Sequence, residues 1–137
     1  TLDGLRPYRL EGDVRLPEKG GISMFDYWKP LLTDYFIEEI KKRGGILVNL
    51  ASGEMKDLFD WKRVESEVRV VTPDFQVWKG GKLKTVVIYA KMCRGEMVRH
   101  IIKNRIGCPE DLRGISWEGF TFDEGLSTDN HLQFVLE

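Results

Sequence analysis

Residues 83–105 constrain this chain more than any other stretch, because a run of β-branched and aromatic residues leads there into a segment with helical spacing. Residues 85–89 predict a short buried strand, and a helix is expected to follow it. Seven basic residues and one acidic residue lie between positions 82 and 105. The sequence therefore predicts a strand-to-helix corner that carries positive charge.

The expected helix has an apolar stripe, since a spacing of about 100° per residue brings four apolar side chains together. These side chains are Met97, Val98, Ile101 and Ile102. Arg94 and Arg105 fall in the same angular range and are predicted to point inward. An inward guanidinium needs a carboxylate, carbonyl groups or a bound anion, because an unpaired buried charge is costly.

Arg94 permits two interpretations. In the first, it is a structural residue paired with a glutamate elsewhere in the chain. In the second it binds an anion, since Gly95 would let a ligand approach the backbone and the first N–H groups of the helix carry partial positive charge. Arg99 and Lys103 fall on the outer side of the helix, where water or a charged partner would meet them.

Length and composition predict one domain that covers residues 1–137, or half of a larger one. With 137 residues, of which 42% are hydrophobic, the chain can bury one core and is too short for two ordinary domains. No apolar run approaches the roughly 20 residues of a membrane span, and no signal peptide opens the chain. A soluble, cytoplasmic protein with no membrane partner is expected.

The charge balance places the basic stretch in an otherwise acidic chain, because the 21 basic and 22 acidic residues nearly cancel. Cys93 and Cys108, with His100 and His131, lack the spacing of zinc ligands, which predicts no metal site and no cofactor. Two free thiols in a reducing cytoplasm are a simpler interpretation than a disulfide.

An amphipathic helix is predicted from Ser23, a good N-cap, to Arg43. Pro30 is expected to kink this helix or to start a second one within it. Its apolar face is expected to be mostly aromatic and to consist of Phe25, Trp28, Leu32, Tyr35, Phe36 and Ile40.

The remaining pattern predicts strands and two short helices. Strands are expected at residues 46–50, 67–72 and 74–78, with a hairpin through 79–82 and two final strands around 120–122 and 132–136. Short helices are expected at residues 55–59 and 108–114. The predicted fold class is therefore α+β, with a mixed sheet, an aromatic amphipathic helix and a basic strand-to-helix corner.

Polar residues follow the strand at residues 46–50. Asn49 lies inside an apolar run and needs hydrogen-bond partners, and Ser52 and Glu54 come just after the strand. Ligands often bind at this edge of α/β sheets. A second interpretation is that Ser52 and its neighbours only cap the next helix.

Several stretches together resemble the YaaA family of bacterial peroxide stress response proteins. The matching residues are Pro7-Tyr8-Arg9-Leu10-Glu11, Tyr27-Trp28, Asn49-Leu50-Ala51-Ser52 with Glu54, Tyr89-Ala90-Lys91, Arg94-Gly95 with Met97 and Arg99, Ile101-Ile102, Asn104-Arg105, and Glu118-Gly119-Phe120 with Phe122. Family members are about twice as long, so the resemblance implies that this chain corresponds to their carboxyl-terminal half.

The resemblance implies a cytoplasmic protein that limits oxidative damage during peroxide stress by keeping free iron low. It also implies a mixed α/β fold with a positively charged cleft that binds double-stranded DNA. Lys91, Arg94, Arg99 and Arg105 match the family's basic motif, and its polar motifs are matched by Tyr8, Arg9, Glu11, Asn49, Ser52 and Glu54. The sequence departs from the family pattern at Gly12-Asp13, Met55 and Lys56-Asp57.

Two functions from different classes follow. The first is DNA binding, in which outward cations contact phosphates: Lys82, Lys84, Arg99 and Lys103. The two helices around residue 107 also favour it weakly, because a tight turn between helices can present N–H groups to a phosphate. The second is an enzyme for a small anionic or phosphorylated molecule held by Lys91, Arg94 and Gly95, with Glu11 or Glu54 as acid or base.

The chain has no nucleotide fingerprint, Walker loop or catalytic triad, so the sequence leaves the enzymatic reaction open. A third interpretation is a scaffold whose activity resides in the missing half. DNA binding in a peroxide stress protein is the function that the sequence favours.

Overall fold

The computed structural model describes residues 14–137, and it confirms an α+β fold with a mixed sheet. Its helices are α1 (Met24–Lys42), α2 (Trp61–Glu67) and α3 (Val87–Asn104), with 3₁₀ helices η1 (Pro17–Lys19), η2 (Gly53–Leu58) and η3 (Pro109–Gly114). Its strands are β1 (Arg15–Leu16), β2 (Ile22–Ser23), β3 (Ile46–Val48), β4 (Arg69–Lys79), β5 (Lys82–Lys84), β6 (Thr121–Phe122) and β7 (His131–Leu136). Within the described residues, no helix has the length and apolar character needed to cross a membrane.

The long strand β4 organises the sheet. It pairs in parallel with β3 on one edge and with β7 on the other, and β6 adds to β7 in antiparallel orientation. The hairpin predicted through residues 79–82 is confirmed, because β5 pairs antiparallel with the end of β4. Two separate strands were expected at residues 67–72 and 74–78. The expected interruption between them is wrong, because β4 is one strand that continues through Pro73.

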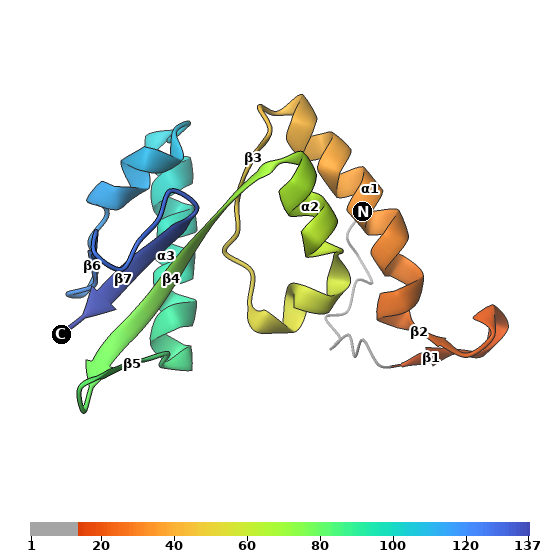
Figure 1. Cartoon of the computed structure of the whole chain (residues 1–137), viewed down its shortest axis with the longest axis horizontal. Coiled ribbons are helices and arrows are strands. Elements are labelled where there is room, and N and C mark those ends of the chain that lie inside the picture. Colours follow the sequence, from red (N-terminus) through yellow and green to blue (C-terminus); the bar gives the residue numbers. More distant parts are fainter. Residues whose placement is uncertain (1–13) are drawn as a thin grey trace, which may run out of the picture.

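The two faces of β4 bury two hydrophobic clusters. Val71 and Phe75 face α3, where they pack with the inner side of that helix and with β7. Val70 lies on the opposite face, in a cluster with residues of α1 and α2. Figure 1 shows α3 behind β4 and β7, while α1 and α2 lie side by side near the first residues of β4.

Helix α1 begins as predicted at Ser23, whose Oγ accepts a hydrogen bond from the Asp26 N–H at 3.0 Å. The helix continues through Pro30 without a second start. The predicted aromatic face is wrong in part, because Trp28 is 43% exposed and Tyr35 is 64% exposed. The buried side consists of Thr33, Ile37 and Ile40, since α2 and β4 approach the helix from that side.

The predicted strand at residues 85–89 is wrong. The chain leaves β5 at Lys84 and enters α3 at Val87, so Val87 and Ile88 form its first turn, 66% and 62% exposed. A run of β-branched residues favours a strand only weakly, because strand formation depends on pairing. Here no described strand extends far enough to pair with residues 85–89. The helix buries Ala90, Cys93 and Met97 instead. The predicted apolar stripe is therefore wrong for Val98 and Ile102, which are 43% and 71% exposed.

The remaining elements largely follow the sequence pattern. The short helices expected at residues 55–59 and 108–114 are 3₁₀ helices, and the final strands form close to their predicted positions. Helix α2 was not predicted. Asp60 caps it by accepting a hydrogen bond from the Arg63 N–H at 3.3 Å, a signal that was present in the sequence.

Candidate functional site

The site begins at a gap in one edge of β4. On that edge β3 pairs only with residues 69–71 and β5 only with residues 77–79. Between these segments Pro73 has no N–H to offer, and the Phe75 N–H is taken by the Asp74 side chain at 2.9 Å. The open edge therefore has no unmet donor, and the chain can leave space beside it.

A cavity of about 370 Å³ occupies this gap, and we call it the edge cavity. It is lined by residues from four parts of the chain: Asn49, Ala51, Ser52, Gly53, Trp61, Thr72, Pro73, Asp74, Arg94 and His131. Three of these residues, Asn49, Ser52 and Arg94, are site residues that the sequence predicted.

The turn after β3 brings two predicted polar residues to the edge cavity. The Asn49 N–H donates to the Val71 carbonyl at 2.7 Å, which extends the parallel pairing, and the Asn49 side chain accepts from the Ala51 N–H at 3.1 Å. Ser52 stands at the N-cap of η2, but its hydroxyl makes no capping hydrogen bond. The interpretation of Ser52 as a side-chain cap is therefore wrong, and its hydroxyl remains available at the cavity.

Arg94 reaches the edge cavity from α3 and is half-buried. It makes no ion pair with any side chain that the structure describes, a set that leaves out the side chain of Glu54. Trp61 adds an indole Nε1 donor that is buried and has no acceptor among the described groups. Donors of this kind suit a ligand rich in acceptors, such as a carboxylate or a phosphate.

Gly95 does not play its expected part in this arrangement. It lies inside α3, eight residues after the helix begins at Val87, so the free N–H groups of the helix start are not near Arg94. The anion site predicted at the helix start is therefore wrong in its geometry. Two parts of the prediction for Arg94 agree with the structure: the residue points inward, and it lines a cavity.

The other predicted cations do not converge on the edge cavity. Lys91, Arg99, Lys103 and Arg105 are exposed, and Arg99 lies 3.9 Å from Glu96 in a weak ion pair. The inward position predicted for Arg105 is wrong, because this residue ends α3 in a left-handed conformation with φ of 53°. Its side chain follows the change in chain direction toward solvent.

Four of the predicted cleft residues have side chains outside the described part of the structure. Tyr8, Arg9 and Glu11 lie outside the described residues, and so does the side chain of Glu54. The edge cavity also contains residues with polar side-chain groups that were not predicted as site residues, namely Trp61, Thr72, Asp74 and His131. A proline followed by an acid inside a strand pattern, as in Pro73-Asp74, was the signal that an edge of the sheet is open.

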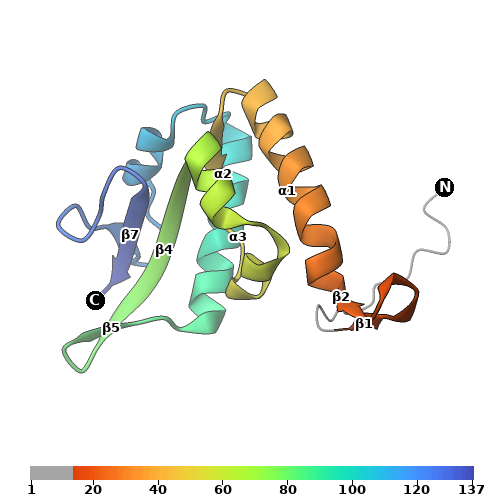
Figure 2. The same ribbon diagram turned by 45° about the vertical axis from the view of Figure 1, so that its right-hand side comes forward.

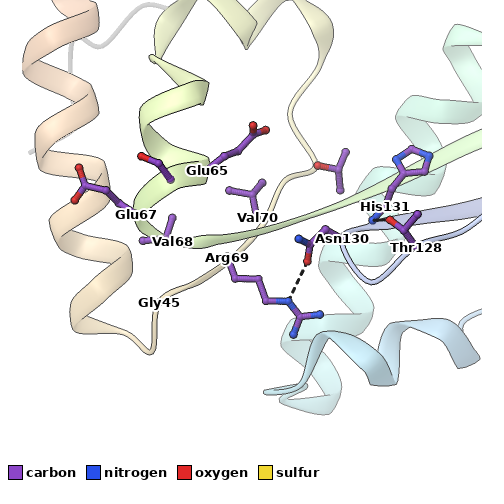
Figure 3. Close-up of a pocket in the computed structure, with 11 residues that line it drawn as sticks. Gly45, Glu65, Glu67, Val68, Arg69, Val70, Thr128, Asn130 and His131 are labelled. Atoms are coloured by element: carbon purple, nitrogen blue, oxygen red, sulfur yellow. Dashed lines mark hydrogen bonds between the residues drawn. The ribbon is translucent and has the colours of Figure 1, made fainter.

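A second, wider cavity of about 810 Å³ adjoins the edge cavity, and the two share Thr72 and His131. Figure 3 shows Arg69 in this cavity pointing toward Asn130 and away from His131. The Arg69 guanidinium donates to Asn130 Oδ1 at 3.1 Å, to the Asp129 carbonyl at 3.0 Å and to Glu110 at 2.8 Å. Because Nε and Nη2 both donate to these groups, Arg69 joins β4 to the loop before β7 and to η3.

Neither thiol is prepared for nucleophilic chemistry. Burial raises the pKa of Cys93 to about 11. Cys108 is exposed and donates to the Glu110 carboxylate at 2.7 Å, which raises the pKa of that thiol. Among the side chains that the structure describes, no three His, Cys, Asp or Glu residues gather in a way that could hold a metal ion.

Comparison with known proteins identifies the family. A model of the peroxide stress protein YaaA matches residues 1–126. The chain belongs to the YaaA peroxide stress protein family. Proteins named UPF0246 are its relatives in Phocaeicola vulgatus, with 73% identity, in Bacteroides thetaiotaomicron, with 66%, and in Clostridium botulinum, with 42%.

The comparisons also set the scale of this YaaA-family chain. The matches cover 98%, 98% and 99% of the chain, but only 53%, 52% and 54% of those three relatives. The chain thus spans about half the length of the curated relatives that it matches. The edge cavity is formed by residues within the part that the family model covers, except His131.

Proposed function

We propose that this chain is part of a cytoplasmic peroxide stress protein that binds double-stranded DNA and helps to limit iron-dependent oxidative damage. The family's description supports the stress response. DNA binding is supported by one observation, the exposed cations along α3 and the β4–β5 hairpin. They are Lys82, Lys84, Lys91, Arg99, Lys103 and Arg105, with Glu96 as the one acidic residue in the same stretch.

Arg99 and Lys103 form the centre of the proposed DNA contact. They are one helical turn apart and both exposed, so their charged groups can contact neighbouring phosphates. Contacts of this kind carry no sequence information and release counterions when they form. The proposed binding is therefore independent of sequence and weakens as salt increases.

The test measures the affinity for a labelled DNA duplex by fluorescence anisotropy at 50 and 200 mM salt. Four phosphate contacts predict a loss of roughly 100-fold in affinity over this range. The double variant Arg99→Glu/Lys103→Glu should bind at least tenfold more weakly than the parent at the lower salt. The matched control Lys29→Glu/Lys62→Glu makes the same change in net charge on α1 and α2, and it should bind within about threefold of the parent.

An affinity that is the same at both salt concentrations contradicts the proposal. So does an equal loss of affinity in the control, because that loss would come from net charge and not from a contact on α3. The part that concerns iron needs a separate measurement. Cells that express the full-length protein should hold less free iron under peroxide, measured by electron paramagnetic resonance, than cells that express the full-length Arg99→Glu/Lys103→Glu variant.

A second candidate function is supported by the edge cavity. We propose that it binds a small anionic molecule, with the Arg94 guanidinium as the charged donor and with Asn49, Ser52 and Trp61 as neutral donors. Asp74 and His131 are available for proton transfer if the bound molecule reacts. If this molecule is a substrate, the protein would be an enzyme that acts on a phosphorylated or acidic small molecule.

Inorganic phosphate and adenosine monophosphate are suitable probes for this second candidate. Each is titrated into the protein while amide shifts are followed by NMR. Shifts should gather at residues 49–53, 72–74 and 94, and the Arg94→Gln variant should lose them while its melting temperature stays within a few degrees of the parent. Shifts that persist in Arg94→Gln, or that Arg99→Gln removes equally, would place the anion elsewhere.

A further inference from the structure

The outer side of α3 has an apolar stripe that nothing in the described structure covers. While Ala90, Cys93 and Met97 face the sheet, the opposite side presents Ile88, Gly95, Val98 and Ile102, and we call this the Gly95 face. Its three apolar side chains are 62%, 43% and 71% exposed. Soluble proteins rarely leave a continuous apolar patch without a partner.

The spacing of this face is typical of helix packing. Ile88, Gly95 and Ile102 are seven residues apart, so they lie above one another along the helix axis, and Val98 lies beside them. Figure 2 shows that α3 is long and regular, running past the sheet over most of the length of β4. A second helix laid along this side would meet three exposed apolar side chains, with Gly95 between them and Lys91 within the same face.

No contact within the described residues explains why a glycine stands at position 95. Glycine is among the poorest residues for a helix interior. A side-chain carbon added at Gly95 would meet nothing within 4 Å, so no described neighbour requires the absence of a side chain. Its backbone geometry is also ordinary, because its φ is not positive. A close approach by another backbone is what a glycine at the centre of such a face allows.

The relatives are longer than this chain, and the additional polypeptide is a candidate occupant of the face. The Phocaeicola vulgatus protein is 73% identical over the matched region, yet that region is only 53% of its length. The longer proteins therefore contain about as much polypeptide again, and this polypeptide is bound to the same chain. A covalently linked segment is present at high effective concentration, so it has a large advantage over any free partner.

We propose that the Gly95 face is the docking surface for the polypeptide that the longer relatives carry outside the matched region, packed as a helix or strand against α3. Lys91 lies within the face, and we expect its ammonium group to meet a carboxylate of that segment at the rim. Arg99 and Lys103 lie at one edge of the face and remain accessible, so docking leaves the centre of the proposed DNA contact intact.

The test is co-expression of the tagged 137-residue chain with the complementary segment of the Phocaeicola vulgatus relative. The two should purify together in equal amounts. The variants Gly95→Leu and Ile102→Glu should each reduce the recovered segment at least tenfold. Leu126→Glu is the matched control, because Leu126 is also an exposed apolar residue, 42% accessible, in a distant loop; it should retain the complex.

Melting temperatures separate docking from folding. Gly95→Leu fills open space and replaces a poor helix former, so the variant alone should melt roughly 2–5 °C above the parent. A variant that is more stable alone and yet loses the segment is the result expected of a docking surface. The proposal is overturned if the parent chain recovers no segment, or if both variants recover as much as the parent does.

A second copy of the chain is the competing occupant. Light scattering after size exclusion should give the mass of a monomer for the chain alone. A dimer that Gly95→Leu dissociates would assign the Gly95 face to a contact between copies, and the proposal would then be wrong.

Discussion

At the scale of single residues, Pro73 and Asp74 decide where the site lies. A strand in the middle of a sheet cannot include a proline without losing a hydrogen bond, and Pro73 lies where β4 has no partner on that edge among the described strands. Asp74 then accepts the hydrogen bond of the Phe75 N–H, which would otherwise point into the gap. Two adjacent residues thereby stabilise an open edge that the edge cavity uses.

Gly119 is the glycine at which an added side chain would fit least well. Its φ is +83°, and an added Cβ would lie 2.8 Å from Leu136 Cδ1. Glu118 before it also has a positive φ, of 48°, so the two form a tight turn between Trp117 and Phe120. The turn holds Phe120 in the hydrophobic cluster against α3.

We predict that Gly119→Ala lowers the free energy of unfolding by about 1–3 kcal/mol, mostly through backbone strain, with a smaller part from displacing the Leu136 Cδ1 methyl, which is the end of a flexible side chain. Chemical denaturation measures this change. Gly80→Ala is the matched control, because Gly80 has a φ of +63° but open space around it; it should lose only the backbone contribution of about 1–2 kcal/mol. Equal losses in the two variants would show that the contact with Leu136 is unimportant.

At the scale of elements, Thr33 joins α1 to α2. Its side chain is 1% exposed, and its Oγ1 accepts a hydrogen bond from the backbone N–H of Asp60 at 3.0 Å. Asp60 in turn caps α2. One buried hydroxyl therefore fixes the start of one helix against the middle of another.

We predict that Thr33→Val costs about 1–3 kcal/mol of stability, because the variant keeps the shape but leaves the part-buried Asp60 N–H without an acceptor. Urea denaturation is the measurement. Thr121→Val, at an exposed position in β6, is the control and should change stability by less than about 0.5 kcal/mol. A loss below that limit in Thr33→Val would mean that water replaces the hydroxyl.

Glu110 and Arg69 join β4 to η3, and this connection depends on pH. The Cys108 thiol and the Arg69 guanidinium both donate to the Glu110 carboxylate and lower its pKa to about 2. When folding lowers the pKa of a carboxyl group, that group stabilises the folded state at pH values above its pKa in the unfolded chain, which is close to 4.3. That contribution is lost as the pH falls through the range from about 4.3 to 2.

We predict that the melting temperature of the parent falls more steeply between pH 4.5 and about 2 than that of Glu110→Gln, because the variant has no carboxylate to protonate. Calorimetry across this range is the measurement. Glu124→Gln, in the exposed loop before β7, should keep the slope of the parent. Parallel curves for the parent and Glu110→Gln would show that this contact does not contribute to folding.

At the scale of the whole molecule, β4 couples the two hydrophobic clusters. Val70 and Val71 are adjacent in the strand, yet they belong to different clusters on its two faces. Figure 1 shows this strand as the element that extends from α2 to the far end of β7. We expect the two clusters to unfold together, as a single domain would.

We predict that Leu112→Ala destabilises both clusters, although Leu112 belongs only to the one against α3. Leu112 is fully buried, so the loss should be about 2–5 kcal/mol. Hydrogen exchange should speed up by the same factor at Val64 in α2 and at Phe134 in β7. Leu126→Ala, at an exposed site, should change neither rate, and unchanged exchange at Val64 in Leu112→Ala would show that the clusters unfold separately.

Local pattern was enough to predict much of the fold and part of the site. The N-cap at Ser23, the strand that leads to Asn49, the hairpin through residues 79–82 and the last two strands all depend on neighbouring residues and were confirmed. The resemblance to the YaaA family was confirmed as well, because it depends on residue identities alone. Of the predicted site, Asn49, Ser52 and Arg94 lie together in the edge cavity.

Only the tertiary structure decided the rest, and the reason is the choice of partners. Residues 87–89 became the start of α3 because no described strand pairs with them, and Trp28 and Tyr35 are exposed because α2 and β4 approach α1 from another side. His131 reaches the edge cavity only because β7 pairs with β4 across some 60 residues of sequence. A sequence determines which faces are apolar and which residues carry charge, but contacts between distant segments determine which of them meet.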